Sequence, residues 1–147
     1  MKKELSHYDE AGQARMVDVG GKEATRRTAR ARAFVRMKPS VVKALPRNRK
    51  GDPLEVARIA GVMAAKRTHE LIPMCHPLAL THVGVEAAVQ RDGVLIETSV
   101  ATTGVTGVEM EALTAVAVAA LTIYDMCKAV DKKMRITEVK LISKTKK

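Results

Sequence analysis

Asp125 and Lys128 have the types and spacing that most directly suggest chemistry. They lie three residues apart, so on a helix they would share one face, and a carboxylate beside an ammonium group can serve as an acid/base couple. The alternative is an ordinary helix ion pair that contributes little to stability. Both follow directly on the uncharged segment 112–124, and its burial would partly desolvate the pair and shift both pKa values.

Glu109 and Glu111 stand at the other end of the same segment, where a helix dipole favours anionic side chains. A capping box with Thr106 explains Glu109 but not Glu111. Glu111 and Asp125 would lie ~21 Å apart along the helix axis, too far for one small substrate. Either the two ends serve different sites, or a second copy brings its Glu111 to the first copy's Asp125. The uniformly apolar middle favours the second alternative, a homo-oligomer with helices packed between chains.

Met74, Cys75 and His76 lie in a segment bounded by prolines. With His69 and His82 in the same part of the chain, metal binding has to be considered, but the spacing does not suit a structural zinc site. A lone cysteine is more often a small buried hydrophobe than a nucleophile. His76, as a proton-transfer or substrate-binding residue, is therefore the strongest candidate in this segment.

The net charge of +10 indicates an anionic partner, which could be nucleic acid, a membrane surface or a polyphosphate metabolite. Lys50, in a basic loop beside Gly51, is suited to contact phosphate as a point charge. Four arginines form either a solvated basic face or an anion-contacting edge: Arg26, Arg27, Arg30 and Arg32. Neither a triphosphatase loop nor a dinucleotide motif is found in the sequence. The 2% aromatic content weighs against base stacking with single-stranded nucleic acid.

The 147 residues are expected to form a single domain, with residues 1–15 as a flexible arm. Two cysteines far apart in the chain predict a reduced, cytoplasmic protein. The first ten residues lack the hydrophobic core of a signal peptide. The longest uncharged run is shorter than the ~20 apolar residues of a transmembrane helix, so no membrane span is predicted.

Hydrophobic periodicity predicts the order β-α-β-β-α-β. Strands are expected at 31–37, 80–90, 94–102 and 135–143, with helices at about 53–67 and 106–130 and one helical turn at 39–45. The first long helix has an apolar face formed by Val56, Ile59, Ala60 and Met63, with Asp52 and Glu55 as a capping box. This order predicts an α+β, ferredoxin-like fold, an antiparallel sheet with both helices packed on one face.

Long strings of the sequence resemble the molybdenum cofactor biosynthesis protein C family, cyclic pyranopterin monophosphate synthase. They are Lys50-Gly-Asp52, segment 57–68 (ARIAGVMAAKRT), segment 71–78 (LIPMCHPL), segment 106–115 (TGVEMEALTA) and segment 119–130 (AALTIYDMCKAV). The resemblance extends from Met16 to Leu141. These strings are far more specific than any short motif above.

The resemblance implies a lyase that rearranges 3′,8-cyclo-7,8-dihydro-GTP to cyclic pyranopterin monophosphate and releases pyrophosphate. It implies a homohexamer, a trimer of dimers, with active sites at the dimer interface. By position, Asp125 and Lys128 would be catalytic. The residues Met74, Cys75, His76, Met110 and Glu111 would line the substrate site. Lys50 and Lys66 would face the triphosphate or assist ring opening, and Arg27 would bind phosphate.

The chemistry implied by the resemblance moves protons and needs neither redox steps nor an enzyme-bound intermediate. We therefore expect no protein cofactor and no protein metal site, with magnesium on the triphosphate left open. Members of the family usually continue with Gly-Gly-Lys-Ser-Gly after the last strand, which segment 141–147 lacks, and Lys144 stands where the family has a lysine before that segment. The rival hypothesis is a non-enzymatic RNA- or DNA-binding module, with affinity that falls steeply with salt.

Overall fold

The computed structural model describes residues 5–147, and residues 1–4, which belong to the predicted arm, lie outside the described part. Its strands are β1 (Thr25–Arg36), β2 (Leu80–Gln90), β3 (Gly93–Gly104) and β4 (Arg135–Lys146). Its helices are α1 (Pro39–Ala44), the 3₁₀ turn η1 (Leu45–Arg47), α2 (Pro53–Lys66), α3 (Thr68–Leu71) and α4 (Glu109–Cys127).

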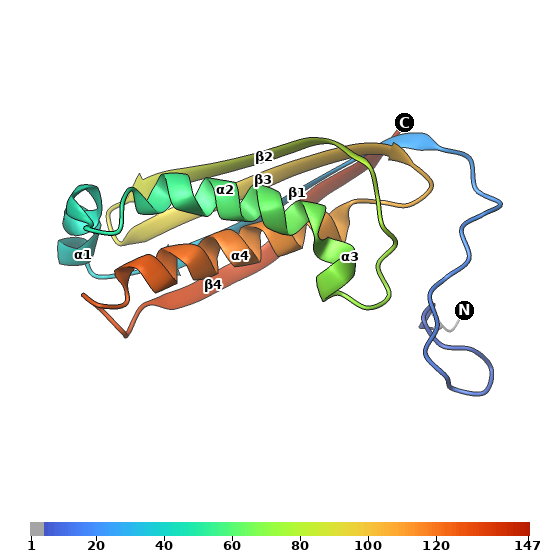
Figure 1. Cartoon of the computed structure of the whole chain (residues 1–147), viewed down its shortest axis with the longest axis horizontal. Helices are drawn as coiled ribbons and strands as arrows, with labels where there is room; N and C mark the ends of the chain where they lie inside the picture. The colour runs from blue at the N-terminus through green and yellow to red at the C-terminus, as the bar shows by residue number, and fades with distance from the viewer. Residues whose placement is uncertain (1–4) are drawn as a thin grey trace.

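The four strands form one antiparallel sheet in the order β2-β3-β1-β4. The β2–β3 hairpin turns at Arg91 and Asp92, and β1 lies between β3 and β4. Helices α2 and α4 lie side by side on one face of the sheet (Figure 1). This arrangement confirms the predicted α+β, ferredoxin-like fold.

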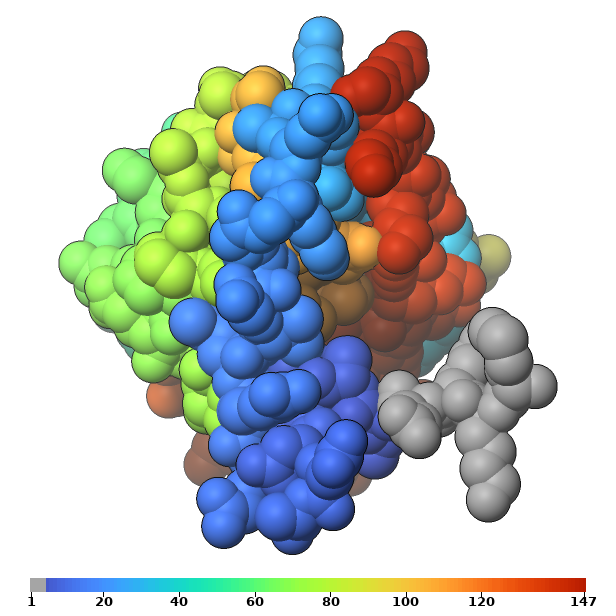
Figure 2. All heavy atoms as spheres, turned by 90° about the vertical axis from the view of Figure 1, so that its right-hand side faces the viewer, coloured from blue at the N-terminus to red at the C-terminus, as the bar shows by residue number. Residues whose placement is uncertain are grey.

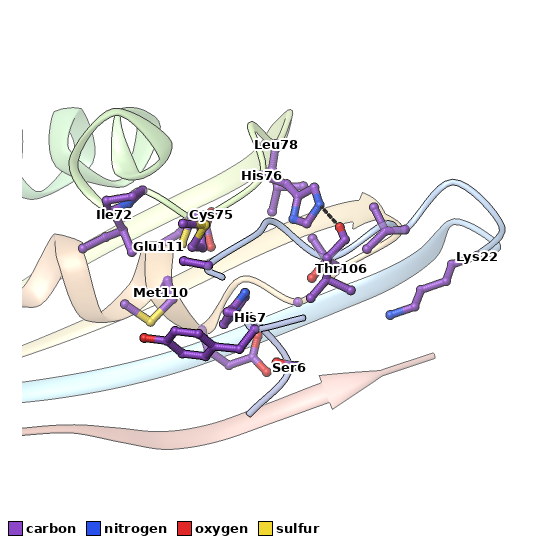
Figure 3. A pocket seen from close by; sticks show the side chains of 18 residues that line it. Ser6, His7, Lys22, Ile72, Cys75, His76, Leu78, Thr106, Met110 and Glu111 are labelled. Atoms are coloured by element: carbon purple, nitrogen blue, oxygen red, sulfur yellow. Dashed lines mark hydrogen bonds between the residues drawn. The ribbon is translucent and has the colours of Figure 1, made fainter. Parts of the chain in front are cut away.

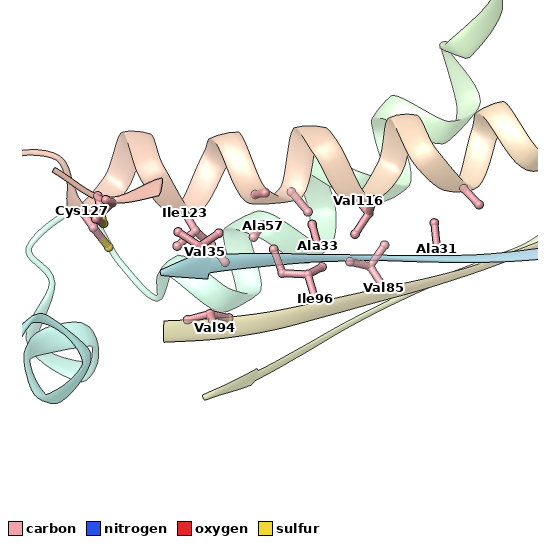
Figure 4. Close-up of a cluster of buried hydrophobic side chains, with 14 of the residues drawn as sticks. Ala31, Ala33, Val35, Ala57, Val85, Val94, Ile96, Val116, Ile123 and Cys127 are labelled. Carbon is pink, nitrogen blue, oxygen red and sulfur yellow. The ribbon is translucent and has the colours of Figure 1, made fainter. Parts of the chain in front are cut away.

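The core lies between the sheet and α4 and is built from small aliphatic side chains. Alternate residues of β1, namely Ala29, Ala31, Ala33 and Val35, are buried toward the helices. Figure 4 shows Val116 and Ile123 of α4 directed at this strand. Alanines on β1 let α4 approach the sheet closely, so the long helix has a fixed position and both of its ends are held relative to the strands.

The bounds of α2 are close to those predicted, but its buried face is not the one that indicated the helix. Asp52 caps it, accepting a hydrogen bond from the Leu54 N–H at 2.9 Å. Side chains of Val56, Ile59 and Met63 point outward, with Ile59 55% exposed. Small residues face the core instead: Ala57, Gly61, Ala64 and Ala65.

The reason for this choice of face is the close packing of α2. A Cβ on Gly61 would lie 3.0 Å from a methyl of Val85 and 3.1 Å from the Ala115 carbonyl oxygen. Only small residues fit between α2, α4 and β2, so the larger apolar side chains are left on the outside. Glu55 pairs with Arg58 at 3.1 Å, a contact that the expected capping box does not include.

Helix α4 is shorter than predicted at both ends. It begins at Glu109 after Val108, without a side-chain cap, so the expected Thr106–Glu109 capping box does not form the helix start. It ends at Cys127 and is followed by a turn. By length and composition α4 is the one helix among the described residues that could cross a membrane, but half of it is buried inside the protein. It packs against α2, β1 and β3, as a core helix does.

Strands β1 and β4 are both longer than predicted. β1 starts at Thr25, so Arg26, Arg27 and Arg30 belong to the strand. β4 continues through the lysine-rich end, where Lys144 pairs with Ala29 and Lys146 with Arg27. Residues 5–24 form an arm with no strand, apart from an isolated bridge between Tyr8 and Ala14. Figure 2 shows this arm, in blue, crossing one end of the molecule between the residue 70–80 region and β4.

Candidate active site

A cavity of about 650 Å³ lies at the N-terminal end of α4. Three segments form it: the arm, the loop 72–78 and the first turn of α4 with the loop before it. All five residues assigned to the substrate line this cavity, namely Met74, Cys75, His76, Met110 and Glu111. Figure 3 shows the side chains of Cys75 and Glu111 close together, with Met110 in the same first turn of α4. The structure therefore brings together Cys75 and Glu111, which are 36 positions apart in the sequence.

Glu111 is the buried acid of this cavity. It is only 4% exposed. Burial raises its pKa above the usual range, and the nearby charge of Glu109 adds to the rise, while a hydrogen bond from its own backbone partly opposes it. Burial, together with the charge of Glu111, also raises the pKa of the Cys75 thiol. Glu111 therefore keeps its proton to a higher pH than an exposed glutamate does, and the thiolate form of Cys75 is disfavoured.

His76 is held by the arm. One of its ring nitrogens, Nε2, lies 2.7 Å from the backbone carbonyl oxygen of Val17 (Figure 3). When Nε2 carries the proton it donates to this carbonyl, which leaves Nδ1 as the acceptor available to a ligand. The arm thus fixes the ring at the cavity wall, and a role of His76 in proton transfer or binding stays a prediction.

A cationic cluster borders the same end of α4. Glu109 accepts a hydrogen bond from the Lys144 ammonium at 2.8 Å. Burial pushes the pKa of Glu109 upward, but Lys144, the backbone hydrogen bond and the charge of Arg27 together hold it below its usual range. Arg27 is fixed by donating to the carbonyl oxygens of Gly104 and Val105, each at 3.2 Å. A second cavity, of about 280 Å³, lies among Arg27, Glu109 and Lys144.

The Asp125–Lys128 pair forms at the opposite end of α4. The Lys128 Nζ lies 2.6 Å from the Asp125 Oδ1, and the two side chains are 51% and 60% exposed, respectively. The hydrogen bond and the charge of Lys128 lower the pKa of Asp125, and Lys50 adds to this effect. Asp125 correspondingly raises the pKa of Lys128. The predicted desolvation of this pair is therefore wrong for a single chain, because both side chains lie on the exposed side of the helix end, whereas Met126 and Cys127 between them are buried.

The structure brings Lys50 to this pair but leaves Lys66 elsewhere. Lys50 lies just before α2 and its charge reaches Asp125. Lys66 is exposed in the last turn of α2, ~21 Å away along that helix. Within one chain, the two lysines assigned to the triphosphate therefore lie at opposite ends of α2, as the two groups of acids lie at opposite ends of α4.

The wall formed by the arm was not predicted from the sequence. Ser6, His7, Tyr8, Val17 and Lys22 all line the main cavity. The arm has no hydrophobic period, and only its final position against loop 72–78 brings these residues to the site. In the described part of the chain, residues 5–147, no three His, Cys, Asp or Glu side chains are grouped so that they could hold a metal ion.

Comparison with known proteins agrees with this geometry. Cyclic pyranopterin monophosphate synthase of Roseiflexus sp. (strain RS-1) is 58% identical over 146 residues, which cover 97% of this chain and 92% of the relative. The enzyme of the same name from Pelotomaculum thermopropionicum is 59% identical over 145 residues, covering 96% and 85%. That of Rhodospirillum rubrum is 57% identical over 145 residues, covering 96% and 87%. A model of the MoaC family matches residues 16–147, and the chain belongs to this family.

Proposed function

We propose that this protein is a cyclic pyranopterin monophosphate synthase of molybdenum cofactor biosynthesis. It converts 3′,8-cyclo-7,8-dihydro-GTP to cyclic pyranopterin monophosphate and pyrophosphate, a reaction of the phosphorus–oxygen lyase type. Relatives with this enzyme name are 57–59% identical over nearly the whole chain. The observation that carries the proposal is the cavity at the start of α4, where two of the strings that resemble the family, segments 71–78 and 106–115, meet.

The cavity supports a division of roles. Its lining of Met74, Cys75 and Met110 offers an apolar surface for the base-derived ring system of the substrate. Glu111, whose pKa is raised by burial, and His76 supply hydrogen bonds and proton transfer at this surface. Arg27, on the adjoining cationic cluster, meets the negative charge of the phosphates.

The Asp125–Lys128 pair supplies the second acid/base group. The charge of Lys50 reaches Asp125, and the loop that carries Lys50 is bonded through Asn48 to the same helical turn, so an anion held by Lys50 would lie near the pair. Preplaced cations of this kind lower the free energy of the transition state in which pyrophosphate leaves. We assign Lys66 to the same triphosphate, and its distance from Lys50 within one chain implies that a neighbouring chain is involved.

We further propose a homohexamer, a trimer of dimers, with each active site shared between two chains. The ~21 Å between Glu111 and Asp125 is the first support for this assembly. A second support is the exposed apolar set on the outer side of the helix layer: Val56, Ile59 and Met63 of α2 with Leu121 of α4. Large apolar side chains grouped on one face are typical of a subunit interface.

Two further assignments belong to this proposal. A cytoplasmic location is consistent with Cys75 and Cys127, which are both free thiols. The reaction as written moves protons and phosphate without a change of oxidation state, so the proposal includes no protein-bound cofactor. Magnesium would enter only with the triphosphate.

The direct test is turnover. Purified protein is mixed with the cyclised GTP intermediate, and cyclic pyranopterin monophosphate and pyrophosphate are measured by chromatography and mass spectrometry. Formation of both products in equal amounts is expected, and absence of both with folded protein would refute the function. Light scattering on the same sample tests the assembly, and a monomer that turns over would refute the shared site.

The nucleic-acid hypothesis is not favoured by the surface. Three arginines on the outer face of the sheet are engaged with carboxylates: Arg30 with Glu97, Arg32 with Glu138 and Arg36 with Asp92. Arginines that are already paired offer less charge to a phosphate backbone.

A further inference from the structure

Asn48 connects the loop that carries Lys50 to the end of α4 that carries Asp125. It is the only asparagine in the chain. We propose that Asn48 is a positioning residue that holds Lys50 beside the Asp125–Lys128 pair. The catalytic meaning of this inference rests on the proposed function, but the contacts themselves do not depend on it.

The side chain of Asn48 uses both ends of its amide group. Its Nδ2 donates a hydrogen bond to the Met126 carbonyl oxygen at 2.8 Å. Its Oδ1 accepts a hydrogen bond from the backbone N–H of Lys50 at 2.9 Å. The Gly51 N–H also donates to the Asn48 carbonyl oxygen at 3.2 Å, which closes the loop around Asn48. One residue therefore shapes the loop and fastens it to the helix.

The partner on α4 is well suited to this contact. Met126 is in the last turn of α4, where carbonyl groups have no partner within the helix. α4 has no basic residue in its last turn that could satisfy them. Met126 directly follows Asp125 and precedes Lys128 by two residues, so the hydrogen bond from Asn48 enters the same helical turn as the acid/base pair.

The part of the loop after Asn48 is open to solvent. A cavity of about 340 Å³ lies between the loop and the helix end, lined by Leu45, Arg49, Lys50, Cys127 and Val130 among others. Arg49, Lys50 and Gly51 are exposed. Because this part of the loop is not packed against α4, the hydrogen bond across this space decides how far Lys50 stays from Asp125. A displacement of about 1 Å at a positioning contact can lower a rate by up to ~100-fold.

A suitable variant removes the hydrogen bond to Met126 but keeps the hydrogen bond from the Lys50 N–H. A serine at position 48 can still accept from the Lys50 N–H, so the local turn is kept, but its hydroxyl is too short to replace the amide at Met126. Asn48→Ser therefore releases the loop from α4 without adding charge. Arg49→Ser is the matched control, since it alters the same loop at a side chain that forms no hydrogen bond with any described residue.

The test uses the full-length protein in its native assembly and two measurements. The first is the titration of the Asp125 carboxyl by NMR with ¹³C-labelled aspartate, assigned by its loss in Asp125→Asn. Lys50→Ala is expected to raise this pKa, Asn48→Ser to raise it by most of the same amount, and the double variant to add nothing to Lys50→Ala. The second is kcat/KM, which we expect to fall about tenfold in Asn48→Ser and less than about twofold in Arg49→Ser.

An unchanged Asp125 titration in Asn48→Ser would overturn the inference, whatever happens to turnover. So would a further shift when Asn48→Ser is added to Lys50→Ala, because Asn48 would then act on Asp125 without Lys50. If intact protein does not convert the cyclised GTP intermediate, the proposed function fails, but the titration still decides whether Asn48 holds Lys50 at Asp125.

Discussion

The two ends of α4 carry acids in opposite surroundings. Glu111 is 4% exposed and faces a cavity, and burial raises its pKa. Asp125 has a side chain that is 60% exposed, and Lys128 lowers its pKa. A single chain thus encloses one end of the helix, with the arm as a wall, and leaves the other end open to solvent.

This difference indicates what each end still needs. The enclosed end has a buried acid whose pKa is raised, but the ammonium group of Lys144 at that end is paired with Glu109 and not with Glu111. The open end has an acid/base couple, with Lys50 beside it, but no enclosure that would strengthen its electrostatic interactions. Two chains arranged with unlike ends together would supply both, and the desolvation expected from the sequence would then come from the neighbouring chain.

The largest expected effect is loss of the couple at the open end. Asp125→Asn and Lys128→Ala should each lower product formation by about 1,000-fold or more, the range expected when a positioned acid or base is removed. Both side chains are exposed, so the melting temperature should change little. Turnover of the cyclised GTP intermediate and thermal unfolding are measured on the same samples.

Glu55 and Arg58 provide the control for this prediction. They form another exposed ion pair between residues three apart, at 3.1 Å on α2. Glu55→Gln should therefore keep the normal rate. Equal losses in Glu55→Gln and Asp125→Asn would mean that the open end of α4 has no special role.

Mixing two inactive variants tests whether unlike ends meet between chains. Glu111→Ala alone and Asp125→Asn alone should both be inactive. When they are unfolded and refolded together, a shared site draws Glu111 from one chain and Asp125 from the other, so about a quarter of the sites regain both residues. Recovered turnover is measured against each variant refolded alone. No recovery in a sample shown by mass spectrometry to contain mixed assemblies would place each active site within one chain.

Local sequence patterns predicted most of the fold, and the exception is the buried face of α2. Alternation predicted the strands, and the Asp52 cap predicted the start of α2. The buried face of α2 was missed because large apolar residues usually mark the core, whereas here packing space selects Ala57 and Gly61. These two small residues are four positions apart, and this spacing was the available signal in the sequence that two helices pack closely.

The site was predictable only where its residues are neighbours in the sequence or match a family string. Cys75 and His76 were found in this way, and the structure placed them with Glu111 in one cavity. The arm residues His7 and Lys22 had no such signal, because an irregular segment has no period that indicates which side chains point inward. The exposure of Asp125 also could not be predicted, because it depends on where the neighbouring elements end.

The pH dependence of stability should have opposite signs at the two ends. The pKa of Glu111 is raised in the folded state, so its stabilising effect is complete below about 4.5 and is lost as pH rises through the folded pKa. Asp125 has a lowered pKa, so its effect is present above its unfolded pKa of 3.8 and is lost as pH falls.

Glu111→Gln should therefore raise the melting temperature at pH 7.5 by ~2 °C or more, with the gain vanishing near pH 4. Asp125→Asn should show no gain at pH 7.5. Scanning calorimetry from pH 4 to 8 gives both differences. A lower melting temperature of Glu111→Gln at pH 7.5 would mean that the cavity stabilises the carboxylate. It would contradict the statement that burial at this end raises the pKa of Glu111.

The smallest effect concerns thiol reactivity, which compares the same two regions. Cys75 is half-buried at the enclosed end, and Cys127 is 2% exposed near the open end. Burial raises the pKa of both thiols, and the charge of Glu111 raises that of Cys75 further.

Because the thiolate is the reactive form, both thiols should react slowly with iodoacetamide at pH 7.5. Glu111→Gln should accelerate Cys75 by about two- to threefold and leave Cys127 unchanged, as measured by peptide mass spectrometry. Equal acceleration of both thiols would indicate general loosening of the fold and would remove the evidence that the Glu111 charge acts on Cys75.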